Sequence, residues 1–416
     1  MKIKNINYID LFAGAGGLSE GFISEGFSPI AHVEMNKHAC DTLKTRVAYH
    51  YLIKNNKFNI YEKYLESKIT RDELWDYIPK SELETVIHSE ISTKTISEIF
   101  SKIDLKLNNK KVNVDLIIGG PPCQAYSIIG RARDKNSMKD DPRNHLYKQY
   151  IHFLKRYQPK MFVFENVPGI LSAKNGEYLN KIFKEIDNCG YNCEYKLLNA
   201  KNFNVLQDRK RVIIIGWKKK LKIEYPIFEE IKNNLSIKEA LFNDLPFLEP
   251  GSGVNYCKYT MPPNNYLKKT KIRTNANFVT QHLARPLNEN DKEIYKIATH
   301  KMIVEKKRLN YTDLPKRLKK HKKDTIFTNR FQVVSPHSLS HTVVAHISCD
   351  GNYYIYPDLK QTRSITIREA ARIQSFPDSF YFEGGQTAAF KQIGNAVPPL
   401  MAAGIAKEIK QKLFNL

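Results

Sequence analysis

The stretch 114-VDLIIGGPPCQAYS-127 decides the fold, because an apolar run ends there in a loop of two glycines, two prolines and a cysteine. Two further runs share this layout: 8-YIDLF-12 is followed by AGAGG, and 161-MFVFENV-167 is followed by PG. Each is typical of a short buried strand that ends in a turn-rich loop. A fourth run, 212-VIIIGW-217, predicts another strand, and segments such as 145-HLYKQYIHFLKRY-157 predict helices between the strands. This alternation predicts a parallel α/β sheet.

The unusual residues of the first three runs lie where such sheets bind ligands. In open α/β sheets, ligands bind beyond the carboxyl ends of the strands. Gly14, Gly16 and Gly17 follow the first run, Cys123 follows the second, and Glu165 lies near the end of the third. We therefore expect these residues to converge on one crevice.

The composition predicts a globular protein that binds a polyanion. The 416 residues are enough for two domains, and 66 Lys and Arg stand against 43 Asp and Glu, a formal charge of +23. A field of that sign favours nucleic acid. A low-GC genome would also raise the Lys content, but without so large an excess over acidic residues.

No targeting, membrane or metal-binding signal is recognisable. The sequence has neither an apolar stretch long enough to cross a bilayer nor the apolar core of a signal peptide, so we expect a cytoplasmic protein. Six cysteines do not make a disulfide framework. Cys189 and Cys193 lack the further ligands that a zinc site needs, so no metal is expected.

The second half departs from the α/β pattern. Residues 250–325 are rich in Pro, Asn and Lys and include 316-KRLKKHKKD-324, which predicts a smaller domain with much of the basic surface. The polar stretch 50–110 predicts an insertion with one or two helices. Apolar order returns after about residue 360, where Thr366 begins a capping-box pattern and a last helix is predicted over 398–413.

The loop in 10-DLFAGAGGLSEGF-22 suits a nucleoside-containing cofactor. Its glycines let the backbone turn tightly and approach a ligand, and Glu34 is placed to accept hydrogen bonds from a ribose. Ser19 replaces the third glycine of the dinucleotide fingerprint, so a dinucleotide is not expected. Taken alone, the loop is also compatible with a purely structural tight turn.

Cys123 is a candidate nucleophile. A lone cysteine after a strand is commonly a small buried hydrophobe, but flanking Gly and Pro argue against simple packing. The attacking species is the thiolate, and a free thiol has a pKa of about 8.5, so the site must stabilise the anion or accept its proton. A thiolate added to cytosine C6 makes C5 nucleophilic towards the methyl group of S-adenosylmethionine. Glu165 is placed to donate a proton to N3 during that addition.

With these residues in hand, the sequence resembles the C5-cytosine DNA methyltransferases, especially the bacterial modification enzymes. Six segments match the family's motifs in its order: DLFAGAGG, GGPPCQAYS, FENV, QDRKRVIIIG, RSITIREAARIQSFPD and KQIGNAVPP. Each segment is moderately specific by itself. All six in order make coincidence very improbable.

The resemblance implies residue roles by position. Cys123 matches the nucleophile, Glu165 the residue that holds cytosine N3, and Arg209 and Arg211 the arginines that support a flipped base and its phosphates. The positions that match cofactor contacts are Phe12, Gly14, Gly16, Gly17, Glu34, Glu90, Ile91, Pro121, Leu146, Asn395 and Val397. The positions that match DNA contacts are Gln124, Ser127 and Gln207. The family usually has an aspartate where this chain has Glu90, so that assignment departs from the pattern.

The resemblance also implies an architecture and partners. We expect a Rossmann-like S-adenosylmethionine-dependent methyltransferase domain over 1–225 and 346–416, with a smaller target-recognition domain, 226–345, inserted in it. Asn395 and Val397 imply that the C-terminal helix returns beside the first strand. The expected substrate is a specific sequence of double-stranded DNA, bound by a monomer that modifies sites for a separately acting restriction endonuclease.

Three other readings remain. A C5-cytosine RNA (tRNA) methyltransferase would share the catalytic core, although the large variable segment favours an enzyme that reads a DNA sequence. A binding module without catalysis is disfavoured by the intact set of Cys123, Glu165, Arg209 and Arg211. An amino-group methyltransferase is disfavoured because its loop would place a small polar residue before two prolines and an aromatic.

Overall fold

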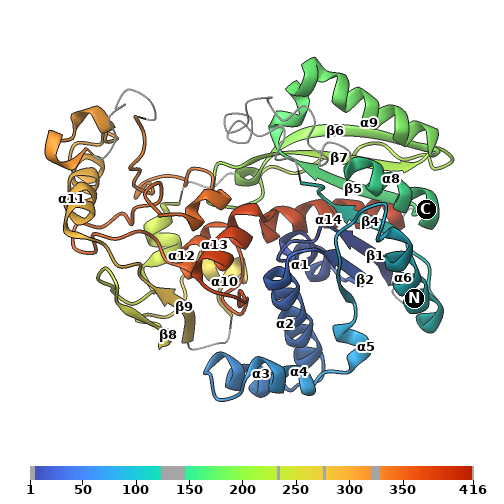
Figure 1. Ribbon diagram of the computed structural model, residues 1–416, viewed down its shortest axis with the longest axis horizontal. Coiled ribbons are helices and arrows are strands. Elements are labelled where there is room, and N and C mark those ends of the chain that lie inside the picture. Colours follow the sequence, from blue (N-terminus) through green and yellow to red (C-terminus); the bar gives the residue numbers. More distant parts are fainter. Residues whose placement is uncertain (1–4, 123–145, 232–234, 275–277, 320–327, 415–416) are drawn as a thin grey trace.

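The computed structural model describes residues 5–122, 146–231, 235–274, 278–319 and 328–414 (Figure 1). Its centre is a seven-stranded sheet in the order β3-β2-β1-β4-β5-β7-β6. The strands are β1 (Ile6–Leu11), β2 (Phe27–Glu34), β3 (Val86–His88), β4 (Leu116–Gly119), β5 (Met161–Asn166), β6 (Tyr191–Asn199) and β7 (Lys210–Lys218). The strands from β3 to β5 pair in parallel, which confirms the predicted α/β class.

One end of the sheet is antiparallel, which the apolar runs did not predict. β7 contains the fourth run but pairs antiparallel with both β5 and β6. Only residues 200–209 join β6 to β7, which is too short for the helical crossover that parallel neighbours need. β6 itself escaped prediction because most of its side chains are exposed at the edge of the sheet and carry no apolar run.

Helices cover both faces of the sheet, and strand residues alternate between them. On one face, Ile117 and Phe162 share an apolar cluster with helices α6 (Ile96–Lys110), α8 (Leu146–Tyr157) and α9 (Glu177–Asn188). On the other face, Leu116 and Ile118 share a cluster with α1 (Gly17–Ser24) and α14 (Pro399–Phe414). Each fully buried large apolar side chain contributes about 1.5–3 kcal/mol, so these two layers dominate the stability of the sheet.

A helical insertion separates β2 from β3. It follows the long helix α2 (Lys37–Lys54) and contains α3 (Phe58–Leu65), α4 (Arg71–Asp76) and α5 (Lys80–Leu83). The predicted one or two helices in 50–110 were therefore too few, and β3 at the sheet edge was missed. These helices are short, and β3 has only three residues, so neither gives a strong periodic pattern.

The sheet with its helices, residues 5–231 and α14, forms the first lobe; residues 235–395 form the second lobe (Figure 1). The second lobe contains an antiparallel hairpin, β8 (Gly253–Lys258) and β9 (Phe278–Leu283). Its helices are α10 (Asn265–Lys269), α11 (Glu289–Ile303), α12 (Ile367–Ile373) and α13 (Gln386–Asn395). Within the part of the chain described here, no helix is both long and apolar enough to cross a membrane.

The C-terminal segment divides between the lobes. α12 begins with the predicted capping box, in which Thr366 and Glu369 bond reciprocally, and α14 matches the predicted last helix. α12 and α13, however, pack in the apolar core of the second lobe with residues such as Leu241 and Val279. This cluster also includes Ala15 and Leu206 of the first lobe, so α12 and α13 contact both lobes, and the predicted domain boundary at residue 346 stays a prediction.

Candidate active site

The sheet brings the predicted site segments to one edge. β1 pairs in parallel with β2 and β4, and β4 with β5, so their carboxyl ends lie together. The loops beyond these ends carry residues 12–17, the glycine loop, and Pro121. Glu34 ends β2, and Glu165 is the penultimate residue of β5. The predicted convergence therefore holds for the described segments.

The glycine loop turns through left-handed backbone conformations. Phe12 has a φ of 55°, Gly14 one of 55° and Gly16 one of 86°. Glycine adopts these angles without a steric penalty, whereas strain of this kind costs about 1–3 kcal/mol in other residues. Phe12 accepts the strain while its ring packs against the sheet's apolar core. The loop thus reverses the chain within a few residues and leads directly into α1.

Gly17 marks the place where the C-terminal segment meets this loop. A Cβ atom at Gly17 would lie 2.4 Å from the carbonyl oxygen of Val397 and 3.0 Å from the ring of Phe376. One turn later, a Cβ at Gly21 would lie 2.4 Å from the Cβ of Ala402. α14 therefore returns beside the first strand, as the resemblance implied, and Val397 lies against the glycine loop.

Glu34 ties the glycine loop to the second strand. Its Oε2 accepts a hydrogen bond from the Gly14 amide at 2.8 Å, and its Oε1 accepts one from the Asn36 amide at 2.8 Å. Burial raises the pKa of this carboxyl, and the backbone donors oppose the rise. A carboxylate has about four acceptor positions, so acceptor capacity remains for a ribose hydroxyl. The loop and its carboxylate thus fit a nucleoside-containing cofactor.

Glu90 and Ile91 lie close to Glu34 in the fold. The amide of Ser89 donates to the carbonyl oxygen of Glu34 at 2.9 Å, which holds the segment after β3 beside the end of β2. Ile91 is buried in the sheet's apolar core, whereas Glu90 is exposed. The two residues are therefore placed near the expected cofactor edge, and their contacts with a cofactor stay a prediction.

Glu165 forms a buried ion pair at the end of β5. Its Oε1 lies 2.8 Å from the Nε of Arg211, and only about a tenth of each side chain is exposed. Burial lowers the pKa of the Arg211 guanidinium, and the Glu165 carboxylate opposes that shift. A Cβ at Gly120 would lie 2.5 Å from Glu165 Oε2, so only glycine lets the loop after β4 pass this close. The carboxylate therefore lies directly beside the segment that leads to Cys123.

Asn166 is a site residue that sequence reasoning missed. Its side-chain amide donates to the carbonyl oxygen of Pro121 at 3.3 Å, and its Oδ1 accepts from the amide of Val167 at 2.9 Å. It thereby joins the end of β5 to the loop after β4. The available signal was its position directly after Glu165 in the FENV motif.

Arg209 and Gln207 have interior positions. Arg209 is fully buried and donates to the carbonyl oxygens of Val343, Gly394 and Ala396 at 2.6–3.1 Å. It thereby joins the two lobes. The side chain of Gln207 is also fully buried, and the predicted substrate and DNA contacts of both residues stay predictions.

Gln207 instead links backbone segments of the second lobe. Its amide nitrogen donates to the carbonyl oxygen of Ile373 at 3.2 Å and to Gln374 Oε1 at 2.9 Å, and its Oε1 accepts from the Val343 amide at 2.8 Å. Arg209 and Arg211 lie two residues apart before a strand, a spacing that places both side chains on one face. Of these three, only Arg211 bonds to a predicted catalytic residue.

Several predicted residues remain without a structural assignment. Cys123, Gln124 and Ser127 lie outside the described residues, and the description stops at Pro122. Leu146 is half-buried at the first position of α8, and Asn395 is exposed at the last position of α13. Their predicted contacts with cofactor or DNA are not tested by this geometry.

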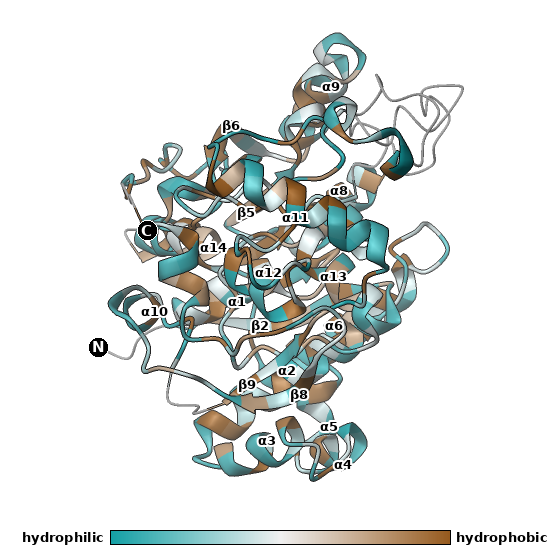
Figure 2. Cartoon of the chain, turned by 90° about the vertical axis from the view of Figure 1, so that its left-hand side faces the viewer, coloured by the Kyte–Doolittle hydropathy of each residue, from teal (hydrophilic) through white to brown (hydrophobic). Residues whose placement is uncertain are grey.

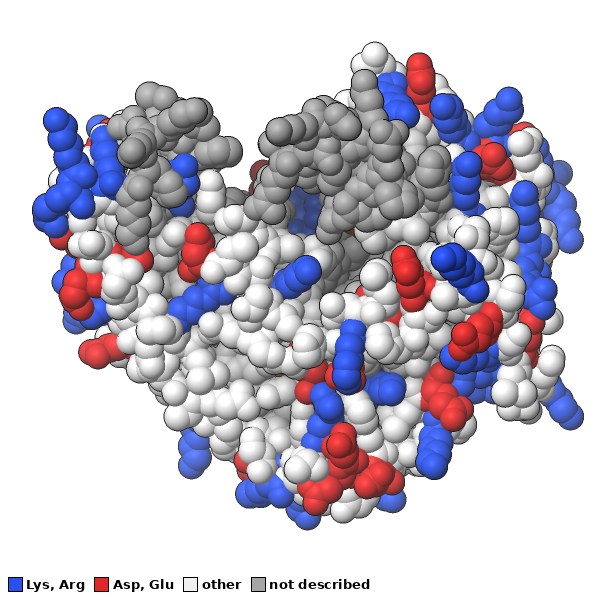
Figure 3. All heavy atoms as spheres, in the orientation of Figure 1, with Lys and Arg blue, Asp and Glu red and all other residues white. Residues whose placement is uncertain are grey.

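The molecular surface is hollowed between the two lobes. Figure 3 shows this hollow, with Lys and Arg side chains around α11 on the second lobe and also along the outer edge of the first lobe. Lys306, Lys307 and Lys316 are exposed there. The residues expected to carry much of the basic surface therefore lie on the second lobe.

Comparison with known proteins identifies close relatives over nearly the full length. The model of the C-5 cytosine-specific DNA methylase family matches residues 6–76 and 80–411. The type II methyltransferase M.Bpa9945I of Bacillus paralicheniformis is 41% identical over 436 residues, which cover 97% of this chain and 98% of that protein. The type II methyltransferase M.DdeI of Desulfomicrobium norvegicum is 31% identical over 433 residues, which cover 99% and 90%.

Solved structures share the fold at lower identity. A candidate DNA modification methyltransferase encoded within an E. coli prophage superposes with a TM-score of 0.63 at 24% identity, covering 99% of this chain and 100% of that one. The Dnmt2 methyltransferase of S. pombe has a TM-score of 0.55 at 15% identity, covering 99% and 100%. At these identities the likeness concerns the fold alone.

Proposed function

Because the chain belongs to the C-5 cytosine-specific DNA methylase family and is thus a DNA cytosine-5-methyltransferase, we propose that it methylates cytosine within a specific sequence of duplex DNA from S-adenosylmethionine. We further propose that the reaction uses a transient bond between Cys123 and cytosine C6. The target base must leave the helical stack, because C6 is inaccessible to a thiolate inside the duplex.

The residues at the sheet edge have distinct tasks in this reaction. The Cys123 thiolate adds to C6, and Glu165 shares a proton with N3, so that C5 gains the electron density it lacks in free cytosine. C5 then attacks an electrophilic methyl group, which S-adenosylmethionine supplies when bound. A base removes the C5 proton, the C5–C6 double bond reforms and the thiolate leaves. The overall exchange is one methyl group for one proton.

One observation carries the proposal: the buried Glu165–Arg211 pair lies against the backbone that leads to the cysteine. Arg211 orients the carboxylate at 2.8 Å, and the missing side chain of Gly120 gives the carboxylate room beside that backbone. A carboxylate fixed in this way suits a flat ring held between it and a nucleophile on the next loop.

The cofactor is proposed to occupy the edge formed by the glycine loop and Glu34. The left-handed turns at Gly14 and Gly16 bring backbone close to a ligand, and Glu34 keeps acceptor capacity for ribose hydroxyls. Val397 lies against the same loop from the C-terminal side. These contacts support binding of a nucleoside-containing molecule there.

The direct test is the substitution Cys123→Ser. We expect it to reduce transfer of a radiolabelled methyl group to duplex DNA at least a thousandfold, while cofactor affinity, measured by calorimetry, stays within about twofold. Retained turnover would contradict the covalent route. Methyl transfer to duplex DNA and to tRNA, measured under the same conditions, distinguishes a DNA methyltransferase from the RNA alternative. Membership of the DNA methylase family favours duplex DNA as the substrate.

Residues 226–345 are proposed to select the target sequence, with exposed lysines of this segment contacting phosphates. Exchanging this segment for that of a relative is expected to transfer the relative's methylated site, read by base-resolution sequencing of 5-methylcytosine. An unchanged site would contradict this assignment. The type II names of the relatives support a further proposal, that the enzyme protects sites from a separate restriction endonuclease.

A further inference from the structure

The insertion over residues 57–84 differs in charge from the rest of the chain. It contains five Lys and Arg against seven Asp and Glu, a net charge of −2, in a protein with a net charge of +23. Such a surface offers no positive field to a polyanion. The insertion therefore has a role other than contact with DNA phosphates.

The insertion shares an apolar core with the second lobe. Tyr61, Leu65, Leu74 and Ile78 of the insertion are buried in one cluster with Phe278 of β9. Phe278 is only 6% exposed, and its ring lies 4.6 Å from that of Tyr256 on β8. Figure 2 shows α3 close to β8 and β9. The insertion and the second lobe are thus joined by buried apolar side chains and not only by contacts between exposed residues.

Tyrosine hydroxyls of α3 bond to the segment between α12 and α13. Tyr61 donates to the carbonyl oxygen of Ser379 at 2.8 Å, and Tyr64 donates to Glu383 Oε1 at 2.6 Å. Both bonds cross from the first lobe to the second. Glu383 also lies 3.9 Å, Oε2 to Nη1, from Arg71, so its carboxylate is surrounded by donors of the insertion.

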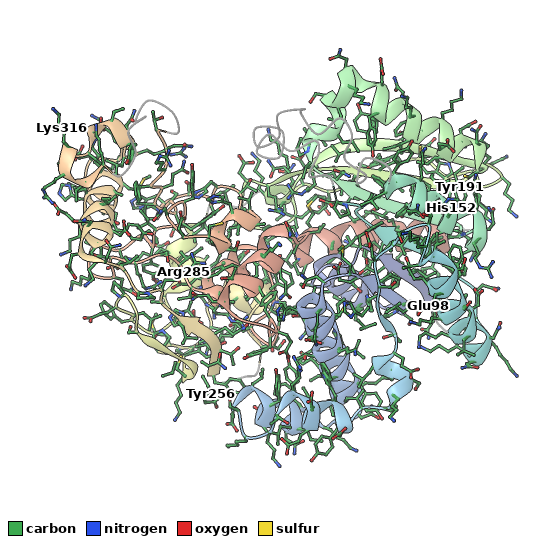
Figure 4. All side chains as sticks on the ribbon, in the orientation of Figure 1. Glu98, His152, Tyr191, Tyr256, Arg285 and Lys316 are labelled. Carbon is green, nitrogen blue, oxygen red and sulfur yellow. The ribbon has the colours of Figure 1, made fainter. Side chains whose placement is uncertain are left out.

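A third bond crosses in the opposite direction. Tyr256 of β8 donates to Glu66 Oε1 at 3.0 Å, just beyond the end of α3. We call this contact between the insertion and the second lobe the junction. Figure 4 shows Tyr256 on the hairpin side of the junction, next to α3. The two lobes therefore exchange tyrosine–carboxylate bonds, one donor from each side.

Helix α2 strengthens the same junction. Thr45 donates to Glu383 Oε1 at 2.5 Å, and the Thr42 hydroxyl accepts from the Glu383 amide at 2.8 Å and donates to Gln392 at 2.7 Å. Arg46 donates to the Ser379 hydroxyl at 3.2 Å. α2 begins just after Glu34, so the junction is connected to the cofactor edge by one continuous helix.

We propose that the insertion is an interlobe brace that fixes the orientation of the second lobe relative to the catalytic edge, with Tyr64 and Tyr256 as positioning residues. The inference rests on the proposed function, in which DNA contacts both lobes. Lobes that are already held in one relative orientation lose little orientational freedom when they bind DNA. Lobes that move relative to each other lose more of this freedom on binding, so their affinity for DNA is weaker, although the bound complex can still react.

The test is the double variant Tyr64→Phe/Tyr256→Phe, which removes the two interlobe tyrosine–carboxylate bonds, keeps the rings and leaves the Tyr61 hydroxyl in place. The substrate is a duplex that carries the site first mapped in a plasmid methylated in cells. We expect KM for this duplex to rise about fivefold to tenfold, with kcat within twofold. Amide hydrogen exchange is expected to become faster in residues 253–258 and 377–385, and cofactor affinity to stay unchanged.

Tyr157→Phe is the matched control. The Tyr157 hydroxyl donates to Asp104 Oδ1 at 3.1 Å, so this variant loses a tyrosine–carboxylate bond within the first lobe. It should show neither the higher KM nor the faster exchange at the junction. A double variant that matches this control in KM and in exchange overturns the brace.

The brace and the proposed function fail in different ways. If the unmodified enzyme transfers no methyl group to any duplex, the proposed function is wrong. Hydrogen exchange at the junction then still decides the brace: faster exchange in the double variant than in Tyr157→Phe supports it, and equal exchange overturns it.

Discussion

The two lobes are stabilised by different interactions. The sheet of the first lobe is layered with aliphatic and aromatic side chains that alternate between its two faces. The first lobe also has arginine–carboxylate pairs, Arg46 with Glu20 and Arg211 with Glu165, but about a tenth of each of these side chains is exposed. The core of the second lobe contains more deeply buried pairs, among them Arg363 with Glu369 at 2.8 Å and Arg372 with Asp244 at 2.5 Å. An apolar layer tolerates small losses, whereas a buried ion pair fails when one partner is removed. The contrast predicts where each lobe is fragile.

The largest effect is expected from Arg372→Met in the second lobe. Arg372 bonds Asp244 and Asp378, so the substitution removes the cation that these two buried carboxylates share. Among the described residues, the only remaining ion-pair partner is Arg273 for Asp244, at 2.7 Å, and Arg368 for Asp378, at 3.8 Å. We expect a loss of about 3–5 kcal/mol in the free energy of unfolding, measured with urea. Hydrogen exchange should quicken mainly in the second lobe.

Two controls sharpen this comparison. Ile118→Val in the sheet removes one buried methylene and should cost about 0.5–1.5 kcal/mol. Lys102→Met removes only an exposed partner of Glu98 and should cost less than about 0.5 kcal/mol. If Arg372→Met destabilises no more than Ile118→Val, the ion pairs do not hold the second lobe together.

The difference between the two lobes also explains which features of the structure could be predicted from the sequence. The strands β1, β4, β5 and β7, the glycine loop and helix α14 itself were predictable, because apolar runs, glycine clusters and caps are local signals, whereas the edge strands β3 and β6 were missed. The interior role of Arg209 and the placement of α12 in the second lobe were not. Both depend on partners more than 100 residues away, such as Val343 for Arg209 and Asp244 for Arg372. A polar residue in a motif does not show whether its partner is a ligand or a distant backbone carbonyl.

A second effect, of intermediate size, is expected from Gly17→Ala at the glycine loop. The new Cβ would lie 2.4 Å from the Val397 carbonyl oxygen, and relieving the overlap costs about 1–3 kcal/mol. We expect cofactor affinity, measured by calorimetry, to fall roughly tenfold. Gly385→Ala is the control, because its Cβ would meet no atom within 4 Å. Equal affinities in the two variants would show that the loop does not bind the cofactor.

The smallest effect is a pH dependence at Glu34. Burial raises its pKa above the ordinary value of 4.5, so the folded protein holds this proton to a higher pH than the unfolded chain does. Stability from this group is therefore lost as pH rises from 4.5 through the folded pKa. Ribose hydroxyls favour the charged carboxylate, so cofactor binding should tighten as pH rises through the same window. Glu34→Gln should remove that dependence in calorimetric titrations; an unchanged pH profile would exclude Glu34 as its source.

The covalent route is tested most directly with duplex DNA that carries 5-fluorocytosine at the methylated position. Fluorine at C5 cannot leave as a proton does, so the account predicts a stable protein–DNA complex in the presence of S-adenosylmethionine. Mass spectrometry should locate the linked base on the peptide that contains Cys123 and find one added methyl group. Complete turnover without a trapped complex, or a link to any other residue, would contradict the account.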